Sequence, residues 1–289
     1  DLFIAQSRHE GSRHHYFLEN RMGKFIRVPN GKWIDKSLSK IATGTSAPGG
    51  GIDRLSTAGI EDIDGDGQID LVLITGKGES LHNTRIVFGQ KGKFKASNVV
   101  ELPADRFFKN KSIPRHYVAG DIDGNGLNDL ILVHLGDQGG SQLGTSLQVL
   151  VQVKKRKFKD KTKHYIPFGG SYKQGDWSYA LHLADLNNDK RKDLIVQNVG
   201  PLRVTGEVSP PRVFLQQRNK QFKPVRISNL TGSRDWILFG IQPVDIDGDG
   251  QMELVGQNKF EASNPAKNYF TIQVVELTTK KVKTKFVSY

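Results

Sequence analysis

Short runs of apolar residues recur along the chain and are separated by loops rich in aspartate and glycine. The runs Leu71–Ile74 and Leu130–Val133 are continuous and have the length expected of buried strands. We find no sustained helical period with capping signals at its ends. The pattern therefore predicts an all-β protein.

The chain repeats itself. One acidic segment occurs four times, with its first acid at Asp62, Asp121, Asp185 and Asp245, at spacings of 59, 64 and 60 residues. Each of the first three copies is followed by a β-rich run, a turn and an aromatic residue, at Phe94, Phe158 and Phe222. Four short strands fit a repeat of this length, and such repeats predict a β-propeller of four-stranded blades.

The first residues, DLFIAQ, match the end of the acidic segment, so the chain is expected to begin inside a fifth repeat. We therefore expect one propeller domain over residues 1–289 with five visible blades. The expected repeats are approximately 1–50 (partial), 51–110, 111–170, 171–230 and 231–289.

Each acidic segment offers oxygen ligands at positions 1, 3, 5 and 9 and a backbone carbonyl at position 7. We name these segments loop one (62–70), loop two (121–129), loop three (185–193) and loop four (245–253). Hard oxygen ligands without histidine or thiolate favour calcium. The alternative is a set of acidic turns that bind no metal.

The sequence thus predicts about four structural calcium ions. The expected ligands are Asp62, Asp64, Asp66, Gln68 and Asp70; Asp121, Asp123, Asn125, Leu127 and Asp129; Asp185, Asn187, Asp189, Arg191 and Asp193; and Asp245, Asp247, Asp249, Gln251 and Glu253. Loop three has Lys190 where the others have glycine. It is expected to be the weakest site, because a left-handed turn costs a non-glycine residue about 1 kcal/mol.

The loops also resemble an EF-hand loop, but they close at position 9 and lead into a strand. In this the chain resembles the FG-GAP/VCBS repeats of integrin-α-like β-propellers, and Phe239-Gly240 preserves the phenylalanine-glycine pair that names the repeat. The resemblance implies four-stranded antiparallel blades with calcium between the first and second strands. Since such relatives usually have seven blades, the five visible blades are either part of a larger ring or a five-bladed ring. The relatives are mostly extracellular and serve adhesion, ligand binding or polysaccharide-acting enzymes.

Charge points to an anionic partner. Lysine and arginine exceed aspartate and glutamate by 42 to 30, and the four loops hold 14 of the 30 acids. A dense basic run, Lys154–Lys159 with Lys161 and Lys163, is expected on the outer hairpin of a blade. It is either an edge guarded against aggregation or an electrostatic docking surface. Nucleic acid is not expected, since no familiar binding motif is present.

A second group of residues recurs just before the first strand of each blade, in loops expected to share one face. The candidates for ligand binding are Arg54, Arg115, His116, Tyr117, Trp177, Tyr179 and Trp236. Trp and Tyr stack on sugars and Arg binds carboxylate or sulfate. The alternatives are packing between blades and catalysis. A lyase would draw on Arg115, His116, Tyr117, Tyr179 and His14, and a hydrolase on Asp53, Asp176 and Asp235.

The absence of cysteine excludes disulfides, cysteine-bound metals and thiol catalysis, and no apolar run is long enough to span a membrane. We expect a calcium-stabilised recognition module, secreted, periplasmic or at the cell surface, that binds an anionic polysaccharide or an extracellular protein. The alternatives are a polysaccharide lyase or glycoside hydrolase, and a structural module of a longer chain. No residue is assigned a catalytic role.

Overall fold

The computed structural model describes eleven segments of the chain. They are residues 2–4, 16–27, 55–75, 84–105, 112–138, 141–167, 178–198, 212–225, 239–257, 271–277 and 282–288. Nearly all of these residues lie in antiparallel strands or in the tight turns between them. The prediction of an all-β fold is confirmed.

The strands form five sheets, and within each sheet the strands pair in chain order. The first sheet has three described strands, β1 (Leu2–Ile4), β2 (Tyr16–Arg21) and β3 (Lys24–Arg27). The second sheet has four strands, as do the third, fourth and fifth, so each has the form of a propeller blade.

The four-stranded sheets have the following strand bounds. The second sheet contains β4 (Leu55–Glu61), β5 (Asp70–Thr75), β6 (Arg85–Gln90) and β7 (Lys93–Glu101). The third contains β8 (Ser112–Gly120), β9 (Asp129–Gln138), β10 (Ser141–Lys154) and β11 (Lys157–Asp160), followed by the short helix α2 (Thr162–Tyr165). The fourth contains β12 (Ser178–Ala184), β13 (Asp193–Asn198), β14 (Arg212–Gln216) and β15 (Phe222–Val225). The fifth contains β16 (Phe239–Val244), β17 (Glu253–Gln257), β18 (Thr271–Leu277) and β19 (Val282–Ser288).

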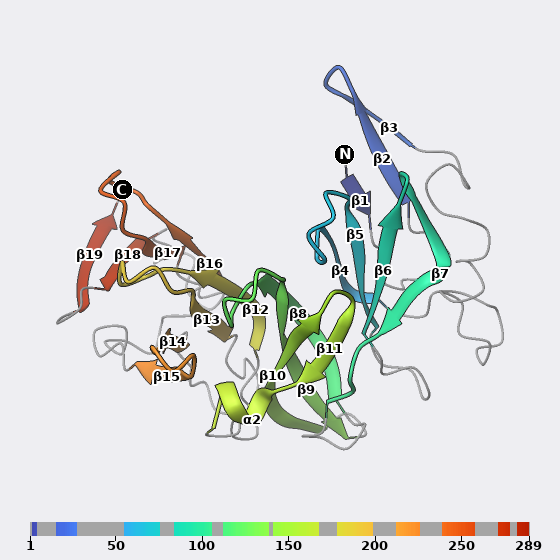
Figure 1. Cartoon of the computed structure of the whole chain (residues 1–289). Coiled ribbons are helices and arrows are strands. Elements are labelled where there is room, and N and C mark those ends of the chain that lie inside the picture. The colour runs from blue at the N-terminus through green and yellow to red at the C-terminus, as the bar shows by residue number, and fades with distance from the viewer. Residues whose placement is uncertain are drawn as a thin grey trace.

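The sheets follow one another along an arc, with the N-terminal and C-terminal sheets at its two ends (Figure 1). Neighbouring sheets meet through their first strands. β8 contacts β4 and β5, β12 contacts β8 and β9, and β16 contacts β12 and β13. This stacking of successive sheets is the arrangement of propeller blades.

The core lies between neighbouring sheets, and β9 shows how the sequence divides it. Leu130 and Leu132 pack toward the second sheet, whereas Ile131 and Val133 pack toward the fourth. Side chains alternate across a strand, so a strand with a neighbour on each face must be apolar at every position. This explains why residues 130–133 are all apolar.

A close approach between sheets explains Gly59 in β4. A Cβ atom on Gly59 would lie 1.6 Å from the hydroxyl oxygen of Tyr117 in β8. The Tyr117 hydroxyl donates a hydrogen bond to Glu61 Oε1 at 2.9 Å, and the ring is buried. Tyr117 therefore belongs to the packing between the second and third sheets.

Candidate metal centres

Each acidic loop connects the first and second strands of a four-stranded sheet, as the repeat predicted. The backbone turns sharply at two positions of each loop. In loop one Gly65 and Gly67 have φ of 69° and 81°, and in loop three Asn188 and Lys190 have φ of 57° and 68°. Position 6 was predicted to be left-handed, but position 4 was not. The structure shows that position 4 is left-handed as well. In loop three this position is Asn188, and asparagine is among the non-glycine residues that adopt this conformation most readily.

In each loop, backbone N–H groups donate hydrogen bonds to the carboxylate of the first aspartate. Asp62 Oδ1 accepts a hydrogen bond from the Asp66 N–H at 3.1 Å, and Oδ2 accepts one from the Gly67 N–H at 2.8 Å. The corresponding aspartates, Asp121, Asp185 and Asp245, also accept backbone N–H groups of their own loops. The loop shape is thus largely built by its first side chain.

The ninth residue ties loops one, two and three to the third strand of their sheets. Asp129 Oδ2 accepts from the Ile122 N–H at 2.9 Å, and Oδ1 accepts from the Gln152 N–H at 2.8 Å. Asp70 and Asp193 make the same pair of bonds, and Glu253 accepts from Ile246. Burial raises the pKa of Asp129 to about 6, against the opposing effect of the backbone donors. The sequence pattern indicated a metal ligand at this position, whereas its hydrogen bond to the third strand is visible only in the fold.

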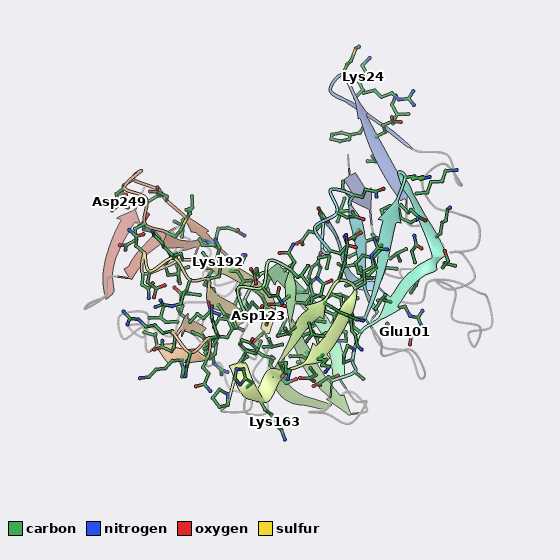
Figure 2. All side chains as sticks on the ribbon, in the orientation of Figure 1. Lys24, Glu101, Asp123, Lys163, Lys192 and Asp249 are labelled. Carbon is green, nitrogen blue, oxygen red and sulfur yellow. The ribbon has the colours of Figure 1, made fainter. Side chains whose placement is uncertain are left out.

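Three of the four loops bring acidic oxygen atoms together. In each of these loops three acidic residues contribute one carboxylate oxygen each, and the three oxygens lie within 4.8 Å of one another. The sets are Asp62, Asp64 and Asp66; Asp121, Asp123 and Asp129; and Asp245, Asp247 and Glu253. An all-carboxylate donor set of this kind fits a hard divalent cation. Figure 2 labels Asp123 of loop two and Asp249 of loop four.

Loop three fits a metal least well. Its Asp185, Asp189 and Asp193 do not form such a set within the described part of the chain. The Arg191 guanidinium donates to Asp189 Oδ2, and its Nε donates to the Gln216 carbonyl at 2.7 Å. Asn187 Oδ1 is nevertheless buried without a hydrogen-bond partner in the structure. In the sequence, Lys190 indicated that loop three would be the weakest metal site. The ion pair between Arg191 and Asp189 could not be predicted from the sequence.

Loops one and two are held by hydrogen bonds from the following sheet. The amide of Gln152 donates to the Ile63 carbonyl of loop one at 3.0 Å, and that of Gln216 donates to the Ile122 carbonyl of loop two at 2.9 Å. Asn128 of loop two also donates to the Asp62 carbonyl at 2.8 Å. A change in one loop therefore reaches the next sheet directly.

Three of the seven ligand-binding candidates, Arg115, His116 and Tyr117, have side chains among the described residues. Arg54, Trp177 and Trp236 lie outside them, as do His14, Asp53, Asp176 and Asp235 and the side chain of Tyr179 in β12. Arg115, His116 and Tyr117 were expected in a loop just before the first strand, but they lie within β8. The strand extends further than predicted, and it accommodates an irregularity between Pro114 and His116.

His116 links the third and fourth sheets. Its Nδ1 accepts a hydrogen bond from the Leu181 N–H of β12 at 3.2 Å, which requires that this nitrogen carry no proton. Burial, reinforced by nearby His182, lowers the pKa of His116 to about 4. The ring is therefore neutral in the folded protein at neutral pH.

Protonation of His116 should make the stability of the fold depend on pH. The folded pKa of His116 lies below the unfolded value of about 6.5, so the unfolded chain binds more protons between these values. Stability from this contact should be present above pH 6.5 and should fall as the pH drops toward 4. We expect His116→Gln, which keeps an acceptor but does not titrate, to show a shallower fall in melting temperature between pH 6.5 and 4.5. Parallel curves for the two proteins, which share all their acidic loops, would contradict the assignment.

A basic segment begins at the β10–β11 turn, which contacts loop one, and continues through β11 and α2. Lys154, Lys157, Lys159, Lys161 and Lys163 are exposed along the end of β10, β11 and α2, and Figure 2 shows Lys163 at the lower edge of the molecule in this view. A shallow groove of about 690 Å³ lies nearby, between the segment that follows α2, loop three and the β14–β15 hairpin. Its lining includes Pro167, Arg191, Arg218, Lys223 and Pro224.

Four successive four-stranded antiparallel sheets, each with an acidic loop between its first two strands, define a repeat protein built from propeller-type blades. A family model described as an FG-GAP-like repeat matches residues 62–132 and 121–196. Residues 62–196 therefore consist of FG-GAP-like repeats, and this part of the predicted resemblance is confirmed. No curated protein matched the chain. No helix among the described residues is long and apolar enough to cross a membrane.

Proposed function

We propose that this protein is a calcium-stabilised recognition module that binds an anionic polysaccharide outside the cell. An acidic extracellular protein is the alternative partner of the same surface. The observation that carries the proposal is the row of exposed lysines from Lys154 to Lys163, which begins at the turn that contacts loop one.

Calcium is the metal that best suits the acidic loops. The donor sets in loops one, two and four contain only carboxylates, and calcium accepts six to eight oxygen ligands in flexible geometry. Extracellular calcium modules typically bind with dissociation constants of about 10⁻⁴–10⁻³ M, a range that extracellular calcium can fill. This supports an extracellular location.

The charge balance explains why the partner should be anionic. Metal binding would neutralise acids in the loops, which hold 14 of the 30 in the chain, and would leave the 42 lysines and arginines largely unopposed. The lysine row and the groove with Arg218 and Lys223 place part of that excess on one region of the surface. A flexible polyanion could contact both.

A polysaccharide lyase or hydrolase remains the second reading, and the described residues favour it less. The Tyr117 hydroxyl is bonded to Glu61 in the packing between sheets, and His116 accepts a backbone N–H. Neither group is free to act on a substrate in this arrangement. Binding without turnover is the simpler function for the described surface.

Size-exclusion chromatography of the protein with heparin in calcium tests the proposal. We expect co-elution with heparin, none with neutral dextran, and loss of co-elution when Lys157, Lys159, Lys161 and Lys163 are all replaced by glutamine. The matched control replaces Lys91 and Lys93, which are exposed on the β6–β7 hairpin, and should still bind. Equal binding by both variants would remove the lysine row from the proposal, and shortened polymer would establish the enzymatic alternative.

A further inference from the structure

The turn between β10 and β11 reaches across to loop one of the preceding sheet. Arg156 donates through Nε to Asp64 Oδ2 and through Nη2 to Asp66 Oδ2, the latter at 3.1 Å. Lys155 Nζ lies 3.6 Å from Asp64 Oδ1. Two cations of one turn therefore engage two acids that stand 90 and 92 residues earlier than Arg156.

The turn is shaped to present Arg156. The residue has a φ of 63°, and its N–H donates to Gln152 Oε1 at 2.6 Å, while the amide of the same Gln152 holds the Ile63 carbonyl of loop one. The guanidinium carbon lies 4.6 Å from the centre of the Phe88 ring. Hydrogen bonds and a cation–π contact thus fix the guanidinium against the loop.

The contact neutralises a buried charge. The Asp64 side chain is 0% exposed, whereas the Arg156 side chain is 35% exposed. A buried carboxylate without a partner is strongly unfavourable, so Asp64 needs a cation in the folded protein. Arg156 supplies that cation from the chain itself.

The same acids form the metal-type set of loop one. Asp64 and Asp66 each contribute an oxygen to the cluster with Asp62. A divalent ion held by these oxygens would lie close to a guanidinium bonded to the same two carboxylates, and the like charges would repel in a partly buried site. A metal ion and the Arg156 guanidinium therefore compete for the carboxylates of Asp64 and Asp66.

The third and fourth sheets provide a matched comparison. Lys220 occupies the corresponding position of the β14–β15 turn, with a φ of 70°. Its Nζ lies near loop two, 3.3 Å from where a Cβ on Gly124 would stand. No ion pair joins Lys220 to the carboxylates of loop two within the described segments. Among loops one and two, the contact with a basic residue of the following sheet's turn is therefore specific to loop one.

We propose that loop one is an arginine-latched cation site, in which a divalent cation displaces Arg156 from Asp64 and Asp66 and frees the β10–β11 turn. The inference rests on the calcium binding proposed above. Displacement would release Lys155 and Arg156 next to the exposed Lys154 and Lys157. Cation binding at loop one would thereby enlarge the basic surface available to an anionic partner.

Calcium titration calorimetry of the wild-type protein, Arg156→Gln and Lys220→Gln tests the competition. We expect Arg156→Gln to tighten one site by about tenfold or more and to leave the other sites unchanged, because the competing cation is gone. Lys220→Gln should leave the affinity of that site unchanged. Arg156→Lys, which keeps the charge but not the two-pronged geometry, should fall between wild type and Arg156→Gln.

Hydrogen exchange read by mass spectrometry locates the effect. Calcium should slow exchange in residues 62–70 and speed it in residues 153–158 of the wild-type protein, but should leave 153–158 unchanged in Arg156→Gln. Binding at loops two and four, with no gain of affinity in Arg156→Gln, would overturn the latch alone. Absence of calcium binding at every loop would overturn the proposed function as well.

Discussion

Removal of calcium is expected to lower the melting temperature by on the order of 10 °C or more. A ligand present at 100 times its dissociation constant adds about 2.7 kcal/mol per site, so two filled loops would add roughly 5 kcal/mol. For chains of this size each kcal/mol shifts the melting temperature by about 2–4 °C. Circular dichroism melts in calcium and in excess chelator measure the difference directly.

The matched variant for this experiment is Asp123→Asn combined with Asp247→Asn. Each asparagine keeps the oxygen that accepts a backbone N–H within its loop but removes a metal-binding charge. We expect the double variant to melt in chelator close to the wild type and to gain much less from calcium. A wild-type protein that melts identically in calcium and in chelator, and that contains no metal by elemental analysis, would rule out the calcium role.

The fold could be predicted because its signals are local and repeated. Four copies of one acidic loop at nearly constant spacing indicated the strand–loop–strand unit, and continuous apolar runs such as 130–133 indicated buried strands. The left-handed turn at Lys190 also followed from its alignment with glycine. Each of these inferences depends on local sequence compared between repeats, and none depends on how the sheets stack.

What the sequence did not reveal depends on contacts between repeats. The pairing of Arg156 with Asp64 joins residues 92 positions apart and depends on how two sheets stack. The basic run was correctly expected on an outer hairpin, but its chain-internal partner could not be inferred from composition. Tyr117 resembled a ligand-binding residue for the same reason, since only the stacked sheets show that its hydroxyl reaches Glu61.

Replacement of Gly89 by alanine is expected to destabilise the protein by about 3 kcal/mol, or roughly 6–12 °C in melting temperature. A Cβ atom at this position would lie 2.2 Å from the Ile69 carbonyl oxygen, which is backbone and cannot rotate away. The Gly89 N–H also donates to Asp70 Oδ1 at 2.9 Å, so moving either strand breaks the brace that closes loop one. Calcium binding at loop one should weaken together with stability.

Gly92→Ala in the β6–β7 turn is the matched control. Gly92 has a φ of 69°, and nothing lies within 4 Å of its added Cβ, so alanine there meets only the backbone cost of about 1 kcal/mol. Thermal melts of the two variants in calcium and in chelator separate steric conflict from backbone conformation. If Gly89→Ala were no more damaging than Gly92→Ala, the close approach of Ile69 would not be what requires glycine. The calcium response of Gly89→Ala then decides whether the brace through Asp70 holds loop one in its metal-binding form.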